Sequence, residues 1–122
     1  MALDHWIYLF FLLLCGHSLA DFALQNEWIA TNKNRHIRDH FSPEEKRSRE
    51  IIWPWLMTAH ALHHAALVYL VTQRVHLAII EAVVHWITDF GKCEGWYGFH
   101  VDQVLHVVAK AIYVVLIAYA IV

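Results

Sequence analysis

The chain carries polar side chains at four-residue intervals inside segments that are otherwise apolar. Residues four apart lie on the same face of a helix, just over one turn from each other, so each set forms a polar row. In chain order the rows are His17, Asp21 and Gln25; His60, His63 and His64; Glu81, His85 and Asp89; and Asp102, Gln103, His106 and Lys110. Imidazole and carboxylate groups are the usual ligands of zinc, manganese and non-haem iron, so the rows predict a metal centre.

Eight of these side chains are candidate metal ligands. They come from all four rows: His17, Asp21, His60, His64, His85, Asp89, Asp102 and His106. A tetrahedral zinc ion needs only about four ligands. We therefore expect either two ions, or one ion whose ligands are held by carboxylate–histidine pairs. A divalent transition metal is expected, with zinc first and manganese or iron as alternatives.

The elements that position these rows are predicted to be membrane-spanning helices. Hydrophobic residues make up 59% of the chain and charged residues 16%, against about 25% charged in an ordinary soluble domain, and the mean hydropathy is +0.40. A helix needs about 20 residues to cross a bilayer. We expect helices over residues 5–24, 53–71, 75–90 and 101–122, the third being the shortest. The predicted fold class is all-α, a four-transmembrane-helix bundle in a single integral membrane domain over residues 1–122.

The segment 26–50, between the first two helices, is predicted to be a cytoplasmic loop. Six of the nine Lys and Arg residues lie in it, and cytoplasmic loops of membrane proteins are enriched in these residues. Four spans then place both termini outside, in a multi-pass protein of the inner (cytoplasmic) membrane of a bacterium. The alternating chain direction brings all the polar rows to similar depth, so the bundle is expected to have a polar His/Asp interior near the cytoplasmic side.

Local signals predict where the helices near this loop begin. Ser42, Pro43 and Glu45 match an N-cap, a first helical position and the third residue of a capping box. Pro54 either kinks a helix that starts in the loop or begins the second span. Four tryptophans lie near predicted helix ends on the loop side, as an aromatic belt does at a membrane surface: Trp28, Trp53, Trp55 and Trp96.

Four stretches carry a resemblance to a known family. They are HSLADFALQNEWIATNK near the N-terminus, TAHALHHAAL in the second helix, VHWITDFGK in the third and VDQVLHVV in the fourth. Together they resemble the DUF3307 family of small bacterial and phage membrane proteins of unknown function, over essentially the whole chain. By position, the resemblance implies a site made of His17, Asp21, Gln25, His60, His85, Asp89, Asp102, Gln103 and His106.

Two further likenesses bear on the chemistry. A looser one is to small membrane proteins described as metal-dependent hydrolases. The HALHH stretch, residues 60–64, also matches the H-x-x-H-H box of membrane fatty-acid desaturases and hydroxylases, which hold two irons. The chain lacks the other histidine-rich boxes and much of the length of those enzymes.

The leading hypothesis is a metal-dependent hydrolase that acts on a lipid-linked or membrane-proximal phosphate or ester. A bound metal lowers the pKa of water toward about 7 and polarises the reacting group. His17, His85 and His106 are the expected core ligands. Lys110 is expected to meet a carboxylate or substrate charge, or to extend to the membrane surface. The expected catalytic residues are Asp21, Asp89, Glu81, Gln25 and Gln103, with Glu81 as a general base and the glutamines holding substrate or water.

Other functions use the same residues differently. Rows of His, Asp and Glu relay protons or metal ions in transport proteins, although the apolar outer halves of the first and fourth helices argue against a continuous path in a monomer. A non-catalytic membrane anchor would use the rows as interhelical hydrogen bonds, and a soluble bundle with a metal core stays open. The expected partners are the lipid bilayer, a membrane-embedded substrate and a second copy of the chain; the net charge of −2 argues against nucleic acid. The remaining histidines are expected to be solvated: His5, His36, His40, His76 and His100.

Overall fold

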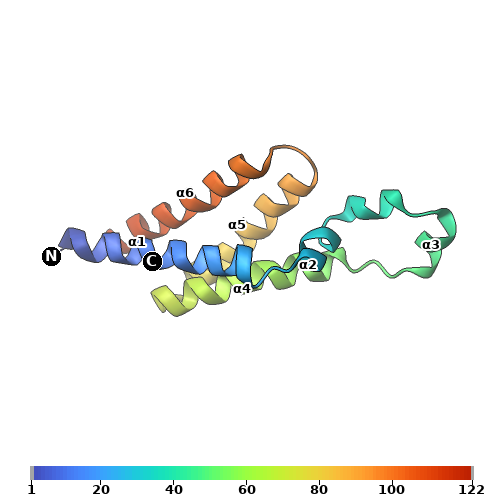
Figure 1. The fold of residues 1–122 in the computed structure, drawn as a ribbon. Coiled ribbons are helices and arrows are strands. Elements are labelled where there is room, and N and C mark those ends of the chain that lie inside the picture. The colour runs from blue at the N-terminus through green and yellow to red at the C-terminus, as the bar shows by residue number, and fades with distance from the viewer. Residues whose placement is uncertain (1, 122) are drawn as a thin grey trace.

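Every regular element between residues 2 and 121, the part of the chain that this computed structural model describes, is a helix. The prediction of an all-α protein is therefore confirmed. Four long helices are joined by shorter helical segments (Figure 1). The elements are α1 (Ala2–Ser18), η1 (Leu19–Ala23), α2 (Glu27–Asn32), η2 (Arg35–His40), α3 (Pro43–Ser48), α4 (Trp53–Thr72), α5 (Val75–Cys93) and α6 (Phe99–Ala118).

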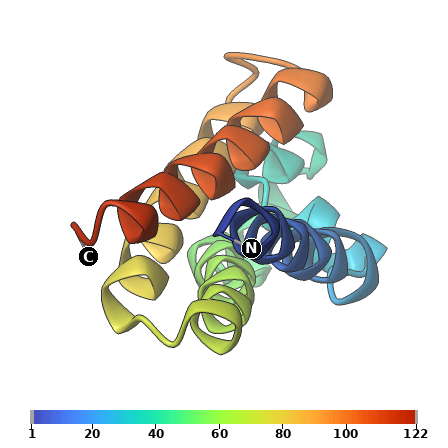
Figure 2. The same cartoon turned by 90° about the vertical axis from the view of Figure 1, so that its left-hand side faces the viewer.

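The four long helices form a bundle in which each one has two neighbours. α4 packs against α5 and α1, and α6 packs against α1 and α5. Viewed down the bundle, the N-terminus, the C-terminus and the α4–α5 turn lie at the same end (Figure 2). The segment containing α2, η2 and α3, here called the loop segment (residues 26–50), extends from the opposite end (Figure 1).

α4 and α5 form a tight hairpin, with only Gln73 and Arg74 between them. Pro54 lies in the first turn of α4, where its missing N–H has no intrahelical partner, so Pro54 begins this helix and does not kink one. α4 ends at Gln73, whose φ of 54° is in the left-handed region that closes a helix. Arg74 follows as the N-cap of α5.

α5 is longer than expected, because it continues through Gly91 to Cys93. A Cβ atom at Gly91 would lie 2.7 Å from the Tyr97 hydroxyl oxygen and 2.9 Å from a ring carbon of Trp96. The missing side chain thus lets the loop after α5 fold back onto the helix, where the Tyr97 hydroxyl donates to the Thr88 carbonyl. Gly91 therefore serves close packing inside the helix.

The first helix ends in one wider turn. In η1, a π-helical turn, the Leu24 N–H donates to the Leu19 carbonyl at 2.9 Å, five residues back. This turn holds Asp21, which is buried. The regular helix ends with this turn, before Gln25. The Gln25 side-chain amide donates to the Asp21 backbone carbonyl at 3.3 Å. Gln25 is therefore beyond the helix, although the four-residue spacing placed it on the same face as Asp21.

The loop segment is more ordered than its composition suggests. Ser42 and Glu45 form the predicted capping box at the start of α3, with Pro43 in its first turn. The Arg38 guanidinium donates to the carbonyls of Lys46, Arg49 and Glu50, which ties η2 to the chain beyond α3.

The interior of the bundle is apolar in one half and polar in the other, and its outer surface is largely apolar. An apolar cluster fills the half nearest the termini: Leu9, Leu13, Val68, Leu77, Ala109, Tyr113 and Val114. Buried charged and polar side chains fill the half nearest the loop segment, while large apolar side chains of all four long helices point outward. Two segments, Leu3–Ala23 and Phe99–Ala118, are long and apolar enough to cross a membrane; the polar rows of α4 and α5 make those helices less apolar.

Candidate metal centre

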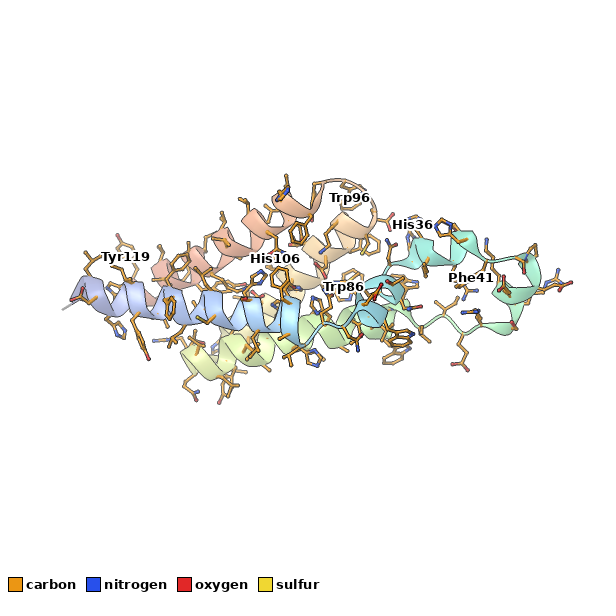
Figure 3. All side chains as sticks on the ribbon, in the orientation of Figure 1. His36, Phe41, Trp86, Trp96, His106 and Tyr119 are labelled. Atoms are coloured by element: carbon orange, nitrogen blue, oxygen red, sulfur yellow. The ribbon has the colours of Figure 1, made fainter. Side chains whose placement is uncertain are left out.

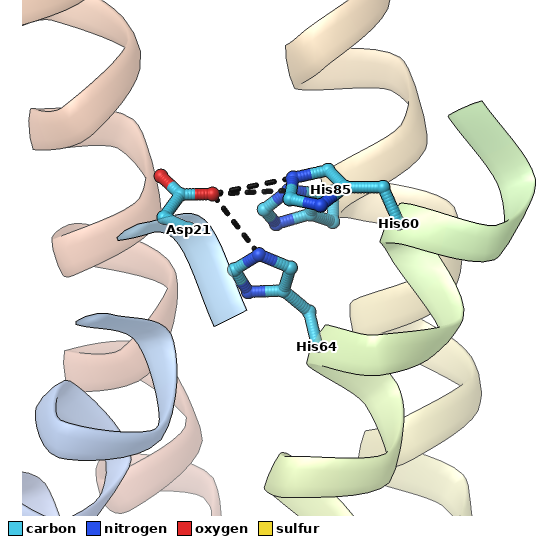
Figure 4. Close-up of side chains that lie close together, drawn as sticks. All are labelled: Asp21, His60, His64 and His85. Atoms are coloured by element: carbon cyan, nitrogen blue, oxygen red, sulfur yellow. Dashed lines mark hydrogen bonds and ion pairs between the residues drawn. The ribbon is translucent and has the colours of Figure 1, made fainter. Parts of the chain in front are cut away.

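Four side chains from three elements converge in the interior of the polar half of the bundle. Asp21 comes from η1, His60 and His64 from successive turns of α4, and His85 from α5 (Figure 4). All four are buried, with at most 8% of any residue exposed. We call them the Asp21 group.

One oxygen of Asp21 faces all three imidazoles. Asp21 Oδ1 lies 3.0 Å from His64 Nε2, 3.2 Å from His60 Nε2 and 4.0 Å from His85 Nε2. In a tetrahedral zinc site with bonds of about 2.0–2.1 Å, neighbouring ligand atoms are about 3.3 Å apart. The separations from Asp21 Oδ1 bracket that value, and all four ligand atoms lie within 4.8 Å of one another, so the group could draw together around one ion.

A second group lies beside the first and has a different composition. In what we call the Asp89 group, His106 Nε2 lies 3.7 Å from Asp89 Oδ1 and 3.4 Å from Asp102 Oδ1. The imidazoles of His85 and His106 are stacked with ring centroids 4.1 Å apart, which connects the two groups. Figure 3 shows His106 within the bundle, between the long helices.

A third combination joins these two. His17, His85 and His106 can also bring one nitrogen each to a common point. His17 Nε2 donates to Gln103 Oε1 at 3.2 Å, which leaves His17 Nδ1 without a hydrogen bond. Gln103 in turn donates to Asp21 Oδ2 at 2.8 Å.

Several of these buried nitrogens make no hydrogen bond. A buried polar atom normally has a partner, because an unpaired one loses its hydration without compensation. Both ring nitrogens of His60 and of His85 lack one, as do His106 Nε2 and Asp102 Oδ1. Lone pairs left free at a shared centre are what a metal ion requires, so the residues present fit such an ion.

Two lysines that sequence reasoning did not place in the site enter the Asp89 group. Lys33, at the end of α2 in the loop segment, is only 2% exposed, and its ammonium group pairs with Asp89 Oδ2. The Lys92 ammonium lies 3.1 Å from Asp89 Oδ1 and 2.9 Å from Asp102 Oδ2. Lys92 could have been found from its three-residue spacing to Asp89 on one helix; no local pattern indicates Lys33.

Glu81 lies behind the Asp21 group. Its Oε1 is 3.4 Å from His85 Nδ1, on the other side of the ring from the Nε2 that faces Asp21. The Lys110 ammonium pairs with Glu81 Oε1 at 2.5 Å, and the Tyr113 hydroxyl donates to Oε2 at 2.8 Å. Lys110 thus meets a carboxylate, one of its expected roles, and Glu81 is placed to orient His85. Tyr113 was missed, because an isolated tyrosine in an apolar run carries no signal.

The other histidines lie outside this cluster. His63 belongs to the predicted row of α4 but is exposed, whereas His60 and His64 are buried. His5, His36, His40, His76 and His100 are exposed, as expected.

An exposed ionic network joins the loop segment to the end of α5. The Arg35 guanidinium donates to both oxygens of Glu94, at 2.6 and 2.7 Å. His36 pairs with Asp39 at 3.1 Å and with Glu94 at 3.2 Å. The hydrogen bonds to Asp39 and Glu94 raise the pKa of His36 above its usual value, and the hydrogen bonds from Arg35 lower the pKa of Glu94.

The fold and the buried cluster define an all-helical protein whose interior could hold a metal ion. Residues 9–121 match the model of the family described as "Protein of unknown function (DUF3307)", and the chain belongs to that family. No curated protein and no solved structure matches the chain. The family assignment confirms the resemblance found in the sequence motifs.

Proposed function

We propose that this protein is an integral membrane, metal-dependent hydrolase that acts on a lipid-linked or membrane-proximal phosphate or ester. The observation that carries the proposal is the Asp21 group: one carboxylate oxygen and three imidazole nitrogens converge in a buried space, and several of those nitrogens have no hydrogen-bond partner. Three or four such ligands are typical of hydrolytic zinc sites.

The placement in a membrane rests on how polarity is distributed. Charged groups in a bilayer face the interior of a bundle and pair with each other, and here the buried charges do so while apolar side chains cover the outside. Trp86 and Phe90 stack, and Trp53 lies tilted against both, at the end of the bundle beside the loop segment, where an interfacial belt would lie. We place the loop segment in the cytoplasm and both termini outside, in a bacterial inner membrane.

The chemistry follows from the positions of the side chains. A bound divalent ion would supply Lewis acidity and a water molecule of lowered pKa. Asp89 Oδ2 lies 3.4 Å from His60 Nε2, so this carboxylate is beside the ligand atoms, where the ammonium groups of Lys33 and Lys92 hold it in place. Hydrolysis there would join the water oxygen to phosphorus or to the acyl carbon and break the ester bond, with one proton of the water passing to the departing oxygen.

Two neighbours set the geometry of this reaction. Gln103 holds both His17 and Asp21 through its amide, and the Glu81 carboxylate lies 3.4 Å from His85 Nδ1, where it could orient the ring of a metal-bound His85. Outer partners of this kind fix the ring orientation of metal-ligating histidines.

Transport is the less supported alternative. A through-path would need polar groups along the whole bundle, but beyond Tyr113 and Lys110 the helices meet through the apolar cluster that includes Leu9 and Leu13. A site closed at one end suits a reaction whose substrate and product use the same opening.

Metal analysis of the detergent-purified protein tests the proposal. We expect at least one equivalent of a transition metal in the wild type and in the control His63→Ala, which alters an exposed histidine of the same helix. The variants His85→Ala and Asp89→Ala should be assayed beside them, with helicity checked by circular dichroism. His85→Ala should lose the metal, and both variants should lose hydrolysis of chromogenic phosphate and carboxylate esters.

Two results would count against this function. Absence of metal in the wild type after supplementation would remove the metal centre. Full metal occupancy without hydrolysis of any phosphoester or ester would leave a metal-binding protein and remove the hydrolase.

A further inference from the structure

The Asp21 and Asp89 groups differ in the cations they already contain. In the part of the chain that the structure describes, Asp21 pairs only with imidazoles and Gln103. Asp89, by contrast, has a lysine ammonium on each oxygen, from Lys33 and from Lys92, and Lys92 also bridges to Asp102.

We propose that the ammonium groups of Lys33 and Lys92 take the place of a second metal ion. The protein then holds one divalent ion, in the Asp21 group, and the two lysines form a subsite for the singly charged phosphate of a phosphodiester. This inference rests on the proposed function and names its substrate class.

The first argument is geometric. A metal ion in the Asp89 group would have to share Asp89 Oδ1 with the Lys92 ammonium group, which lies 3.1 Å from it. At Asp102 the ion would use Oδ1, the oxygen that faces His106, while Lys92 contacts Oδ2 at 2.9 Å and stays beside the ion. Lys33 covers the remaining oxygen of Asp89 and is itself buried. No such sharing is needed in the Asp21 group.

The second argument is the charge of the buried cluster. Among the described residues, four carboxylates (Asp21, Glu81, Asp89 and Asp102) meet the ammonium groups of Lys33, Lys92 and Lys110. With neutral imidazoles the cluster carries one net negative charge. One divalent ion makes it singly positive, and a phosphodiester monoanion then neutralises it. Two divalent ions would leave three uncompensated positive charges in a space from which water is excluded, which is costly.

The third argument is the chemistry of the lysines. An ammonium group offers three donors and a point charge, and it is a common partner of phosphate oxygens. The Lys92 side chain is 24% exposed, so its ammonium group is the one that a phosphate can approach from the surface of the bundle. Lys33 pairs with the other oxygen of Asp89, so a phosphate held by Lys92 would have a second ammonium group nearby.

Metal stoichiometry separates this inference from the proposed function. We expect one equivalent of zinc in the wild type, one in Asp89→Asn/Asp102→Asn and none in His60→Ala/His64→Ala. Asp102→Asn alone serves as a milder variant if the double variant does not fold. Two equivalents in the wild type, or loss of zinc in Asp102→Asn, would overturn the inference while leaving a metal centre intact. No zinc in the wild type would overturn the proposed function itself.

Calorimetric titration with dimethyl phosphate tests the anion subsite directly. In the zinc-loaded protein we expect Lys33→Gln/Lys92→Gln to weaken binding of dimethyl phosphate about tenfold or more, because each lysine supplies a charge-assisted hydrogen bond. The matched control is Lys46→Gln, which alters an exposed lysine of the loop segment and should bind as the wild type does. Equal affinity in the double variant and the wild type would contradict the subsite.

Discussion

In the half of the bundle next to the loop segment, the long helices meet through carboxylates, imidazoles and ammonium groups, whereas in the half next to the termini they meet through leucine, valine and alanine. The same four helices build both halves. In the polar half each buried charge depends on a particular partner, since a charge without one is expensive. In the apolar half the contacts are interchangeable, and only volume and shape matter.

The difference indicates how the protein separates stability from chemistry. The apolar half holds the helices together without any polar requirement. The polar half contains the groups that could bind a cation and an anion. Ion pairs such as Lys110 with Glu81 offset the cost of burying its charges. The candidate site therefore lies in the half of the bundle where a substitution is expected to be tolerated least.

The largest expected effect is the loss of one partner from the buried pair of Glu81 and Lys110. Lys110→Met leaves the Glu81 carboxylate uncompensated, so we expect the free energy of unfolding to fall by about 3–5 kcal/mol. The double variant Lys110→Met/Glu81→Gln should recover much of this loss, because no buried charge remains. Denaturant titration in detergent measures both. If the double variant were no more stable than Lys110→Met, the pair would not be the source of the effect.

A smaller effect is expected from truncation in the apolar half. Leu77 is fully buried in the apolar cluster, and Leu77→Ala should cost about 2–3 kcal/mol through lost contacts and a cavity. Because the site lies in the other half, metal content should stay at the wild-type value. A change in zinc stoichiometry in Leu77→Ala would break the separation of the two halves.

The smallest effect is expected in the exposed network beside the polar half. The pKa of His36 is higher in the folded protein than in the unfolded chain, where it is about 6.5. Its pairs with Asp39 and Glu94 therefore stabilise the fold fully below a pH of about 6.5. This contribution is lost as the pH rises through the pKa of the folded protein. An NMR titration of His36 should show a pKa above the usual value, lowered toward it in Glu94→Gln. An unchanged His36 pKa in Glu94→Gln would remove Glu94 as a cause.

Much of the candidate site follows from spacing alone. Asp21, His60, His64 and His85 were all predicted as ligands, because four-residue intervals fix which residues share a helical face regardless of how the helices pack. The same local reasoning predicts the capping box at Ser42. It failed for Gln25, because the π-helical turn ends the helix and no simple pattern announces such a turn.

Local patterns in the amino-acid sequence specify the helices, their polar faces and the family to which the chain belongs. Which charges meet depends on how the helices and the loop segment pack together. Lys33 lies in the predicted cytoplasmic loop, yet the fold brings it to Asp89, 56 positions along the chain. Tyr113 gains its contact with Glu81 in the same way. The physical reason is that helical periodicity is a local property of the backbone, whereas the pairing of buried charges depends on how separate helices and a returning loop share one interior.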